Sequence, residues 1–210
     1  MPRPYKLTED GRAARAARST ETREALMAAA HALFGQHGYD GVSVTEIARK
    51  AGVSASLINT YFEGKAGLAY ALVESLNDAQ EAASRAIVEG GGPPLRRLRD
   101  MLLVWARGDL SDPRILQVVQ GYSWQWSDET ETRNRATRAI FKGLVADLVA
   151  EAQHSGEIAA TLAPARLADA IFGLYTWRTR DAVFSRRAPE EALDLLWPQI
   201  ESLLQAARPA

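Results

Sequence analysis

The polar side chains whose types and spacing best fit a chemical role lie in a short segment, residues 54–65. Its sequence is Ser-Ala-Ser-Leu-Ile-Asn-Thr-Tyr-Phe-Glu-Gly-Lys. If this segment is a helix, Leu57, Ile58 and Tyr61 share one apolar face. The residues on the opposite face are Ala55, Ser56, Asn59 and Thr60. Amide and hydroxyl groups can form hydrogen bonds with the edges of DNA bases, and a methyl group can contact thymine. The pattern predicts base reading by this face, although an ordinary solvated helix face has the same composition.

Other polar residues near this segment are candidates for binding the sugar–phosphate backbone of DNA. Most of them are expected at the N-termini of helices, where unpaired backbone amides and the helix dipole attract anions. Contacts of this kind fix the register of a protein on DNA but do not read its sequence. The expected phosphate-binding residues are Ser43, Thr45, Ser54, Tyr61 and Lys65.

Two short helices joined by a tight turn are needed to position these groups. Ser43 followed by Glu46 is the pattern of a capping box, which starts a helix. Gly52 can adopt the left-handed conformation that ends a helix, and Ser54 is a candidate N-cap for the next one. A helix-turn-helix has this organisation, and its second helix enters the DNA major groove. The spacing alone fits an ordinary helical hairpin equally well.

A longer pattern is more specific than the spacing of the two helices. A helix ending in Phe34-x-x-x-Gly38-Tyr39 precedes Val42-Ser43-Val44-x-x-Ile47-Ala48-x-x-Ala51-Gly52-Val53-Ser54, and Ile58-x-x-Tyr61-Phe62-x-x-Lys65-x-x-Leu68 follows. Over about residues 20–70 the sequence resembles the DNA-binding domain of the TetR/AcrR family of bacterial transcriptional regulators. Leu57 and Asn59 depart from the family pattern, which often has a small polar residue and a tyrosine at these positions. The departures affect the details of base reading and not the motif.

Composition favours an all-α protein and excludes several kinds of site. The chain has 210 residues, 47% of them hydrophobic, and no cysteine. Strand-like runs of β-branched and aromatic residues are absent from the sequence. The lack of cysteine excludes disulfides, zinc–thiolate sites and thiol catalysis. The sequence has no Gly-x-Ser-x-Gly motif, no glycine-rich phosphate loop and no cluster of histidines and carboxylates. We therefore expect no enzyme activity, no catalytic residue, no metal and no cofactor.

The distribution of charge and of apolar residues bears on partners and location. Residues 1–65 carry nine Lys or Arg and seven Asp or Glu, a net charge of +2 in a chain whose net charge is -1. No apolar run approaches the length of about 20 residues that crosses a bilayer. The N-terminus has no apolar stretch typical of a secretory signal. We expect a cytoplasmic protein without a membrane partner.

The helical pattern predicts about nine helices, with a three-helix head at the N-terminus and a helical body at the C-terminus. The expected segments are a flexible basic arm over residues 1–18, the helix-turn-helix domain over 19–64, a connecting helix over 65–89, and the body over 90–210. The first helix is expected from about Thr20 to His37. The arm has two interpretations, a solvated tail that extends the first helix, or a segment that touches phosphates or the minor groove.

The resemblance implies two functions for the body, homodimer formation and binding of a small-molecule effector. The last two helices, at about 164–185 and 189–206, are expected to pair with a second subunit, so that two heads read a pseudo-palindromic double-stranded operator. The aromatic residues expected to line an effector pocket are Trp105, Tyr122, Trp124, Trp126, Phe141, Phe172, Tyr175 and Trp177. In both cases the same residues would also serve as ordinary core. The sequence does not identify the effector.

The favoured interpretation is a DNA-binding transcriptional regulator, a repressor that an effector releases from its operator through the connecting helix. An effector shifts such an equilibrium only by its difference in affinity for the two states. The alternative is an architectural or regulatory DNA-binding protein that needs no effector and acts through a protein partner. In that case all the aromatic residues of the body are core.

Overall fold

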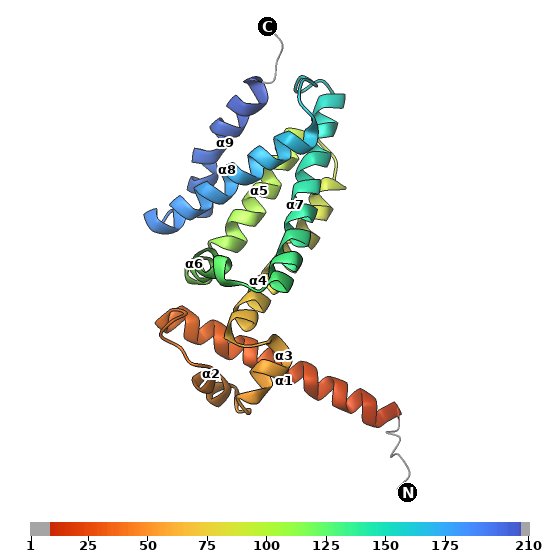
Figure 1. The fold of residues 1–210 in the computed structure, drawn as a ribbon. Helices are drawn as coiled ribbons and strands as arrows, with labels where there is room; N and C mark the ends of the chain where they lie inside the picture. Colours follow the sequence, from red (N-terminus) through yellow and green to blue (C-terminus); the bar gives the residue numbers. More distant parts are fainter. Residues whose placement is uncertain (1–8, 207–210) are drawn as a thin grey trace, which may run out of the picture. The chain divides into compact units, whose positions relative to one another are not determined.

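The computed structural model describes residues 9–206, and every regular element in this part of the chain is helical. The elements, in chain order, are α1 (Glu9–His37), α2 (Val44–Ala51), α3 (Ser56–Phe62), α4 (Lys65–Val88), α5 (Pro94–Asp109), α6 (Pro113–Tyr122), the short 3₁₀ helix η1 (Ser123–Gln125), α7 (Asp128–His154), α8 (Pro164–Ser185) and α9 (Pro189–Ala206) (Figure 1). With nine α-helices among the described residues, the predicted all-α fold of about nine helices is confirmed.

The helices form two compact units whose boundary lies within a helix. The first unit ends at Leu72 and the second begins at Val73, so α4 contributes its first turns to one unit and the remainder to the other. A helix occupies nearly all of the expected connecting segment 65–89, and the boundary between the two units falls within it. The break expected around residues 90–94 is also present, because α4 ends before it and Pro94 opens α5.

The first helix is longer than the sequence suggested. It was expected from about Thr20, after a flexible arm over 1–18, but it begins at Glu9 and includes residues 9–18. Residues 9–18 thus agree with one of the two interpretations of the arm, an extension of the first helix, and do not form a flexible segment. The segment is rich in Ala and Arg, which are strong helix formers. The hydroxyl of Thr20 donates to the carbonyl of Ala16 (3.2 Å), which is a bond inside a continuing helix and not a cap. Residues 1–8 of the expected arm lie outside the described residues.

A small apolar core holds the first unit together. Helix α1 packs against α2, and α2 packs against α3. The side chains with no exposed surface in this core are Leu26, Ala30, Phe34, Ile47, Ile58 and Leu68. Since Leu68 belongs to α4, the first turn of that helix is part of the same core.

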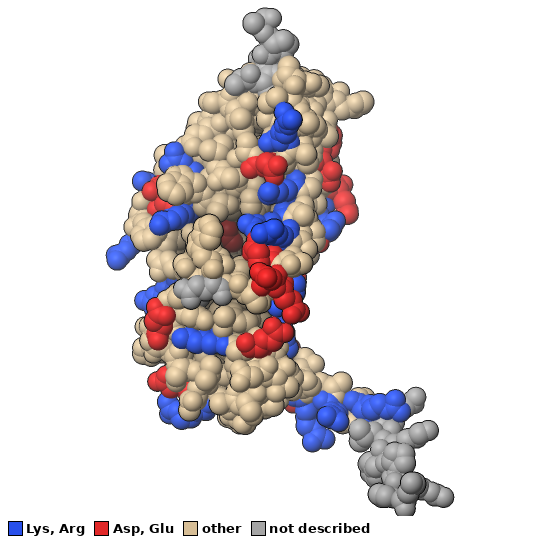
Figure 2. Space-filling model, in the orientation of Figure 1, with Lys and Arg blue, Asp and Glu red and all other residues tan. Residues whose placement is uncertain are grey.

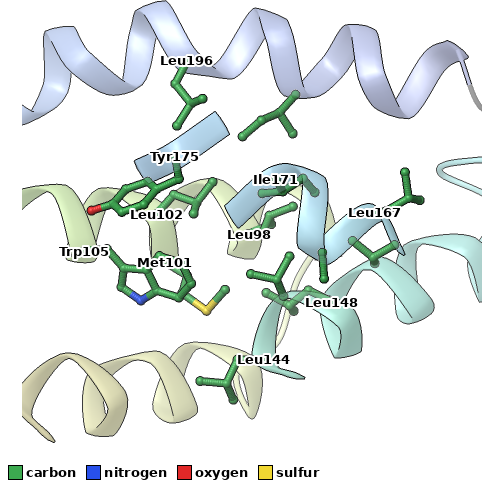
Figure 3. Close-up of a cluster of buried hydrophobic side chains, with 14 of the residues drawn as sticks. Leu98, Met101, Leu102, Trp105, Leu144, Leu148, Leu167, Ile171, Tyr175 and Leu196 are labelled. Atoms are coloured by element: carbon green, nitrogen blue, oxygen red, sulfur yellow. The ribbon is translucent and has the colours of Figure 1, made fainter. Parts of the chain in front are cut away.

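A larger core fills the second unit. Helix α7 packs against α8 and α5, and α9 packs against α5 and α8. Figure 3 shows labelled core side chains from all four of these helices: Leu98, Met101, Leu102, Trp105, Leu144, Leu148, Leu167, Ile171, Tyr175 and Leu196. The apolar residues whose spacing predicted these helices therefore also form the contacts between them.

One buried cation joins three helices of the second unit. Arg97 of α5 is 6% exposed. Its Nη1 donates to the carbonyl oxygen of Val88 at the end of α4 (2.6 Å), and its Nη2 forms an ion pair with Glu151 of α7. The carbonyl at the end of α4 would otherwise lack a helical partner, so Arg97 fixes this end of α4 to the body.

Candidate functional site

The start of α2 is held by a complete capping box. The Oγ of Ser43 accepts a hydrogen bond from the amide of Glu46 (3.2 Å) and donates one to its carboxylate (2.7 Å), while the amide of Ser43 donates to the same carboxylate (2.8 Å). These bonds, mainly the one from the Ser43 backbone, lower the pKa of Glu46. The predicted cap is confirmed. Both donors of Ser43 are used within the cap, and its expected phosphate contact stays a prediction.

The turn between α2 and α3 was predicted correctly at its first residue and wrongly at its last. Gly52 ends α2 in the left-handed conformation, with φ 71°. Ser54 was expected to be the N-cap of α3, but the N-cap is Ala55 and no side chain caps this helix. The Oγ of Ser54 lies 2.9 Å from that of Ser56 instead. The amide of Leu57 donates to the carbonyl of Ser54 (3.1 Å), so tight backbone bonds of the 3₁₀ type close the first turn.

Helix α3 has one face in the core and one in solvent. Ile58 and Phe62 are buried, whereas Asn59 and Thr60 are exposed. Of the other residues in the predicted base-reading set, Ser56 is exposed and Ala55 is half-buried. The hydroxyl of Thr60 donates to the carbonyl of Ser56 (3.2 Å), which leaves its oxygen as an acceptor and its methyl group as an apolar contact. The Asn59 amide makes no hydrogen bond within the described part of the chain and has both donors and its acceptor available.

Tyr61 and Lys65 both make contacts within the first unit. The hydroxyl of Tyr61 accepts a hydrogen bond from Ser19 of α1 (3.1 Å), so its own proton remains available to an acceptor such as a phosphate oxygen. The Nζ of Lys65 lies 4.1 Å from the centroid of the Tyr39 ring. Partial burial lowers the pKa of Lys65, and the carboxylates of Asp40 and Glu46 oppose this shift. Thr45, in the first turn of α2, is exposed.

Further cations of the first unit are exposed although they were not assigned to the site from the sequence. Arg49 and Lys50 lie in the last turn of α2. Arg12, Arg15 and Arg18 recur every three residues along the start of α1, a spacing that places them on one side of a helix. Figure 2 shows Lys and Arg side chains gathered along this end of α1. In the sequence these three residues belong to the arm that is expected either to extend the first helix or to touch DNA, and in the structure they lie on α1.

The aromatic residues expected to line an effector pocket do not form one group. Four of them form a cluster, in which the ring centroids of Phe141, Phe172 and Tyr175 lie 5.1, 6.2 and 5.4 Å from that of Trp105. Tyr122 and Trp126 are half-buried. Trp124 and Trp177 are 93% and 67% exposed, which corrects their expected place in a buried lining. Apolar periodicity alone could not distinguish these two exposed residues from buried ones. The helices from α6 to α8 have neighbours on only part of their surface, and periodicity does not show which part.

A polar cluster beside these rings was not recognised from the sequence. The Oδ1 of Asp109 accepts a hydrogen bond from Nε2 of Gln80 (3.0 Å), and its Oδ2 accepts one from the hydroxyl of Tyr175 (2.7 Å). Burial raises the pKa of Asp109, although these two hydrogen bonds oppose the shift. The three residues come from α4, α5 and α8, so no local pattern connects them.

The last two helices have the bounds that the sequence predicted, and they carry exposed apolar side chains. Trp177 and Phe184 of α8 are 67% and 66% exposed, and Leu195 of α9 is 44% exposed. The guanidinium of Arg180 lies over the rings of Trp177 and Phe184, at 5.8 and 4.8 Å from their centroids. Large apolar side chains grouped on an exposed surface are typical of an interaction site.

Two other kinds of site are absent from the described residues. Within residues 9–206, no three His, Asp or Glu side chains are grouped so that they could hold a metal ion. No helix in the same range is both long enough and apolar enough to cross a membrane.

The head of the chain matches a known sequence family. Residues 26–72 match the family described as bacterial regulatory proteins, tetR family. Over 72 residues the chain is 40% identical to the HTH-type transcriptional regulator BetI of Agrobacterium fabrum, an alignment that covers 34% of this chain and 35% of BetI. The chain covers less than half the length of the curated relatives that it matches.

Solved structures share the fold over nearly the whole chain. The fatty acid degradation regulator FadR of Bacillus halodurans has a TM-score of 0.71 at 19% identity, over 90% of this chain and 97% of that one. Thermus thermophilus FadR, a TetR family transcriptional repressor in complex with lauroyl-CoA, has a TM-score of 0.66 at 21% identity, over 85% of this chain and 92% of that one. The head of the chain thus matches the tetR family over residues 26–72, and the chain as a whole shares the fold of the TetR family repressor from Thermus thermophilus.

Proposed function

We propose that this protein is a sequence-specific DNA-binding regulator that represses transcription until a small-molecule effector binds its body. The observation that carries the proposal is the division of α3, with Ile58 and Phe62 in the core and Asn59 and Thr60 in solvent. A recognition helix needs this arrangement, because its buried face fixes the orientation of the face that reads base edges.

We assign base reading to the exposed face of α3, and Asn59 is the residue of this face best suited to it. An asparagine amide can make a bidentate contact with adenine. Thr60 contributes an acceptor and a methyl group, since its proton is used inside the helix. The residues proposed to contact phosphates are Ser43, Thr45, Ser54, Tyr61 and Lys65, together with the exposed cations Arg49 and Lys50.

The proposed active form is a homodimer that binds a pseudo-palindromic operator. A symmetric dimer repeats the same contacts on two half-sites. The exposed apolar side chains Trp177, Phe184 and Leu195 support an interface formed by α8 and α9. The proposed regulator would act in the cytoplasm of a bacterium.

Effector binding is assigned to the second unit. The FadR structure from Thermus thermophilus, which shares this fold, was determined with lauroyl-CoA. The aromatic cluster around Trp105 provides apolar walls, and Asp109 provides a polar group next to it. An effector acts if it binds one state of the protein more tightly than the other, and α4 is the helix common to both units.

Selection from random double-stranded DNA tests the DNA-binding proposal. The full chain should enrich one inverted repeat, because two identical heads read two half-sites. Failure to enrich any sequence would reject the proposal. Genomic sites carrying the repeat, followed by a transcription assay with the purified protein, would separate repression from activation.

An effector-independent regulator remains the second candidate. It is favoured by the tight packing of Trp105, which is 2% exposed and in contact with three other rings. A thermal-shift screen on the full chain distinguishes the two, because a ligand that binds the native state raises its apparent stability. A screen without any stabilising compound would favour the second candidate.

A further inference from the structure

We propose that the effector is a cation of the alkyl- or arylammonium class, and that Asp109 is its counter-ion. The inference rests on the proposed effector-binding function of the body and specifies the chemistry of that site. It is carried by a buried carboxylate that lacks a cationic partner and by the aromatic rings beside it.

The carboxylate of Asp109 is held by neutral groups only. The amide of Gln80 donates to one oxygen and the phenol of Tyr175 to the other. Within the described part of the chain, Asp109 forms no ion pair with Lys, Arg or His. Burying a carboxylate is costly unless a positive charge or enough hydrogen bonds compensate it. Two neutral donors compensate it in part, and a monovalent cation would supply the missing charge.

Asp109 lies among buried residues but is not itself completely buried. Gln80 and Tyr175, which hold the carboxylate, are 7% and 6% exposed. Asp109 is surrounded by protein, yet it keeps some solvent-accessible surface. Asp109 is thus largely desolvated, but the residue is not completely sealed from solvent.

The position of this carboxylate next to aromatic rings specifies the kind of cation. The Tyr175 ring, whose hydroxyl bonds to Asp109, packs against Trp105, and the Trp105 ring also contacts Phe172. Ring faces attract ammonium groups, most strongly when both are shielded from water. A divalent metal ion fits poorly, because Mg²⁺ and Ca²⁺ need about six or more oxygen ligands. One carboxylate and apolar rings fit a single charge with hydrocarbon substituents.

Gln80 connects this site to α4. Its Nε2 donates both to Asp109 and to the backbone carbonyl of Trp105 (3.0 Å), so the two amide hydrogens join α4 to α5. Gly108 makes room for this contact, because a Cβ at that position would lie 2.4 Å from Nε2 of Gln80. An ammonium group at Asp109 would compete with Gln80 for the carboxylate, and this competition gives the ligand a direct effect on α4.

The test compares two probes of the same shape, phenyltrimethylammonium and its neutral isostere tert-butylbenzene. Calorimetric titration of the full chain should give an affinity for the cation at least about tenfold higher than for the isostere, which is within the range of a desolvated cation–π and ionic contact. Asp109→Asn should abolish this preference. The matched control is Asp147→Asn, which changes an exposed aspartate on α7 and should leave the preference intact.

Several outcomes would overturn the inference. These are equal affinity for the two probes, tighter binding of the neutral probe, binding of neither, or an unchanged preference in Asp109→Asn. The wild-type comparison of the two probes holds even if that variant fails to fold. Selection of DNA by the same protein preparation reports separately on the proposed function. An enriched inverted repeat without an ammonium preference rejects the cation site alone, whereas the absence of any enriched sequence rejects the proposed regulator.

Discussion

At the scale of single residues, the side chains around α3 have two separate tasks. Ser43 uses its donors to start α2, and Tyr61 ties α3 to α1 through Ser19. Asn59 keeps its hydrogen-bonding groups in solvent. The first two residues hold the helix-turn-helix in shape, and Asn59 has the chemistry that distinguishes one base from another. Substitutions of these residues should therefore separate loss of stability from loss of recognition.

Replacing Asn59 and Thr60 together by Ala should reduce discrimination between the selected repeat and a scrambled duplex. Each good base contact contributes about 1–3 kcal/mol of discrimination, so a loss of this order is expected in competition binding. Thr132→Ala is a suitable control, because Thr132 makes the same hydrogen bond to a carbonyl four residues earlier, at an exposed position of α7. An unchanged preference in the double variant would reject the assigned face.

Lys65→Ala should weaken binding to all DNA sequences to a similar extent. A phosphate contact releases counterions from DNA, so its loss should reduce the slope of log affinity against log salt by about 1. Lys142→Ala, which removes a cation of the body paired with Asp169, should leave the slope unaltered. If Lys65→Ala also leaves it unaltered, Lys65 serves only to cover the Tyr39 ring.

Asp109→Asn should change the dependence of stability on pH. Burial raises the pKa of Asp109 above its ordinary value of 3.8, so the folded protein holds this proton more tightly than the unfolded chain. Wild-type stability should therefore fall, relative to the variant, as pH rises from about 3.8 through the raised pKa, and the difference should level off above it. Urea unfolding of both proteins across this range measures the effect, and a difference independent of pH would contradict it.

At the scale of elements, the junction between α3 and α4 is sterically constrained. Glu63 ends α3 with φ 58°, in the left-handed region. A Cβ at Gly67, in the first turn of α4, would lie 1.7 Å from the carbonyl oxygen of Phe62. The direction in which α4 leaves α3 thus depends on the absence of a side chain at residue 67.

Gly67→Ala should destabilise the protein by about 1–3 kcal/mol, the usual cost of inserting an atom into a filled space. Gly143→Ala provides the opposite case, since a Cβ on that glycine of α7 would have nothing within 4 Å. There the better helix propensity of Ala should stabilise the protein by up to about 1 kcal/mol. Chemical unfolding measures both, and equal effects would show that the crowding at Gly67 relaxes without cost.

At the scale of the whole molecule, the exposed apolar surface of α8 and α9 bears on assembly. Light scattering should give a mass near twice 22.9 kDa. Trp177→Glu combined with Phe184→Glu should shift the protein toward the monomer, because two apolar side chains that the proposed interface would bury become charged. Trp124→Glu changes a residue that is 93% exposed outside these helices and should leave the mass unchanged. A wild-type monomer at micromolar concentration would reject the proposed interface.

Local signals in the sequence determined the helices and the helix-turn-helix. The Ser43 cap, the stop at Gly52 and the bounds of α8 and α9 were all predicted, because capping and apolar periodicity act within a turn or two of chain. The same signals predicted which residues of α3 face solvent. They failed at Ser54, where backbone bonds closed the turn without a side chain.

Only the tertiary structure decided which residues that are distant in sequence come together. It separated the exposed Trp124 and Trp177 from the cluster around Trp105. It also brought Asp109 within hydrogen-bonding distance of Gln80 and Tyr175, which lie 29 and 66 residues away along the chain. These contacts depend on how helices pack, and a helical pattern gives a residue's face but not the helix that will cover it.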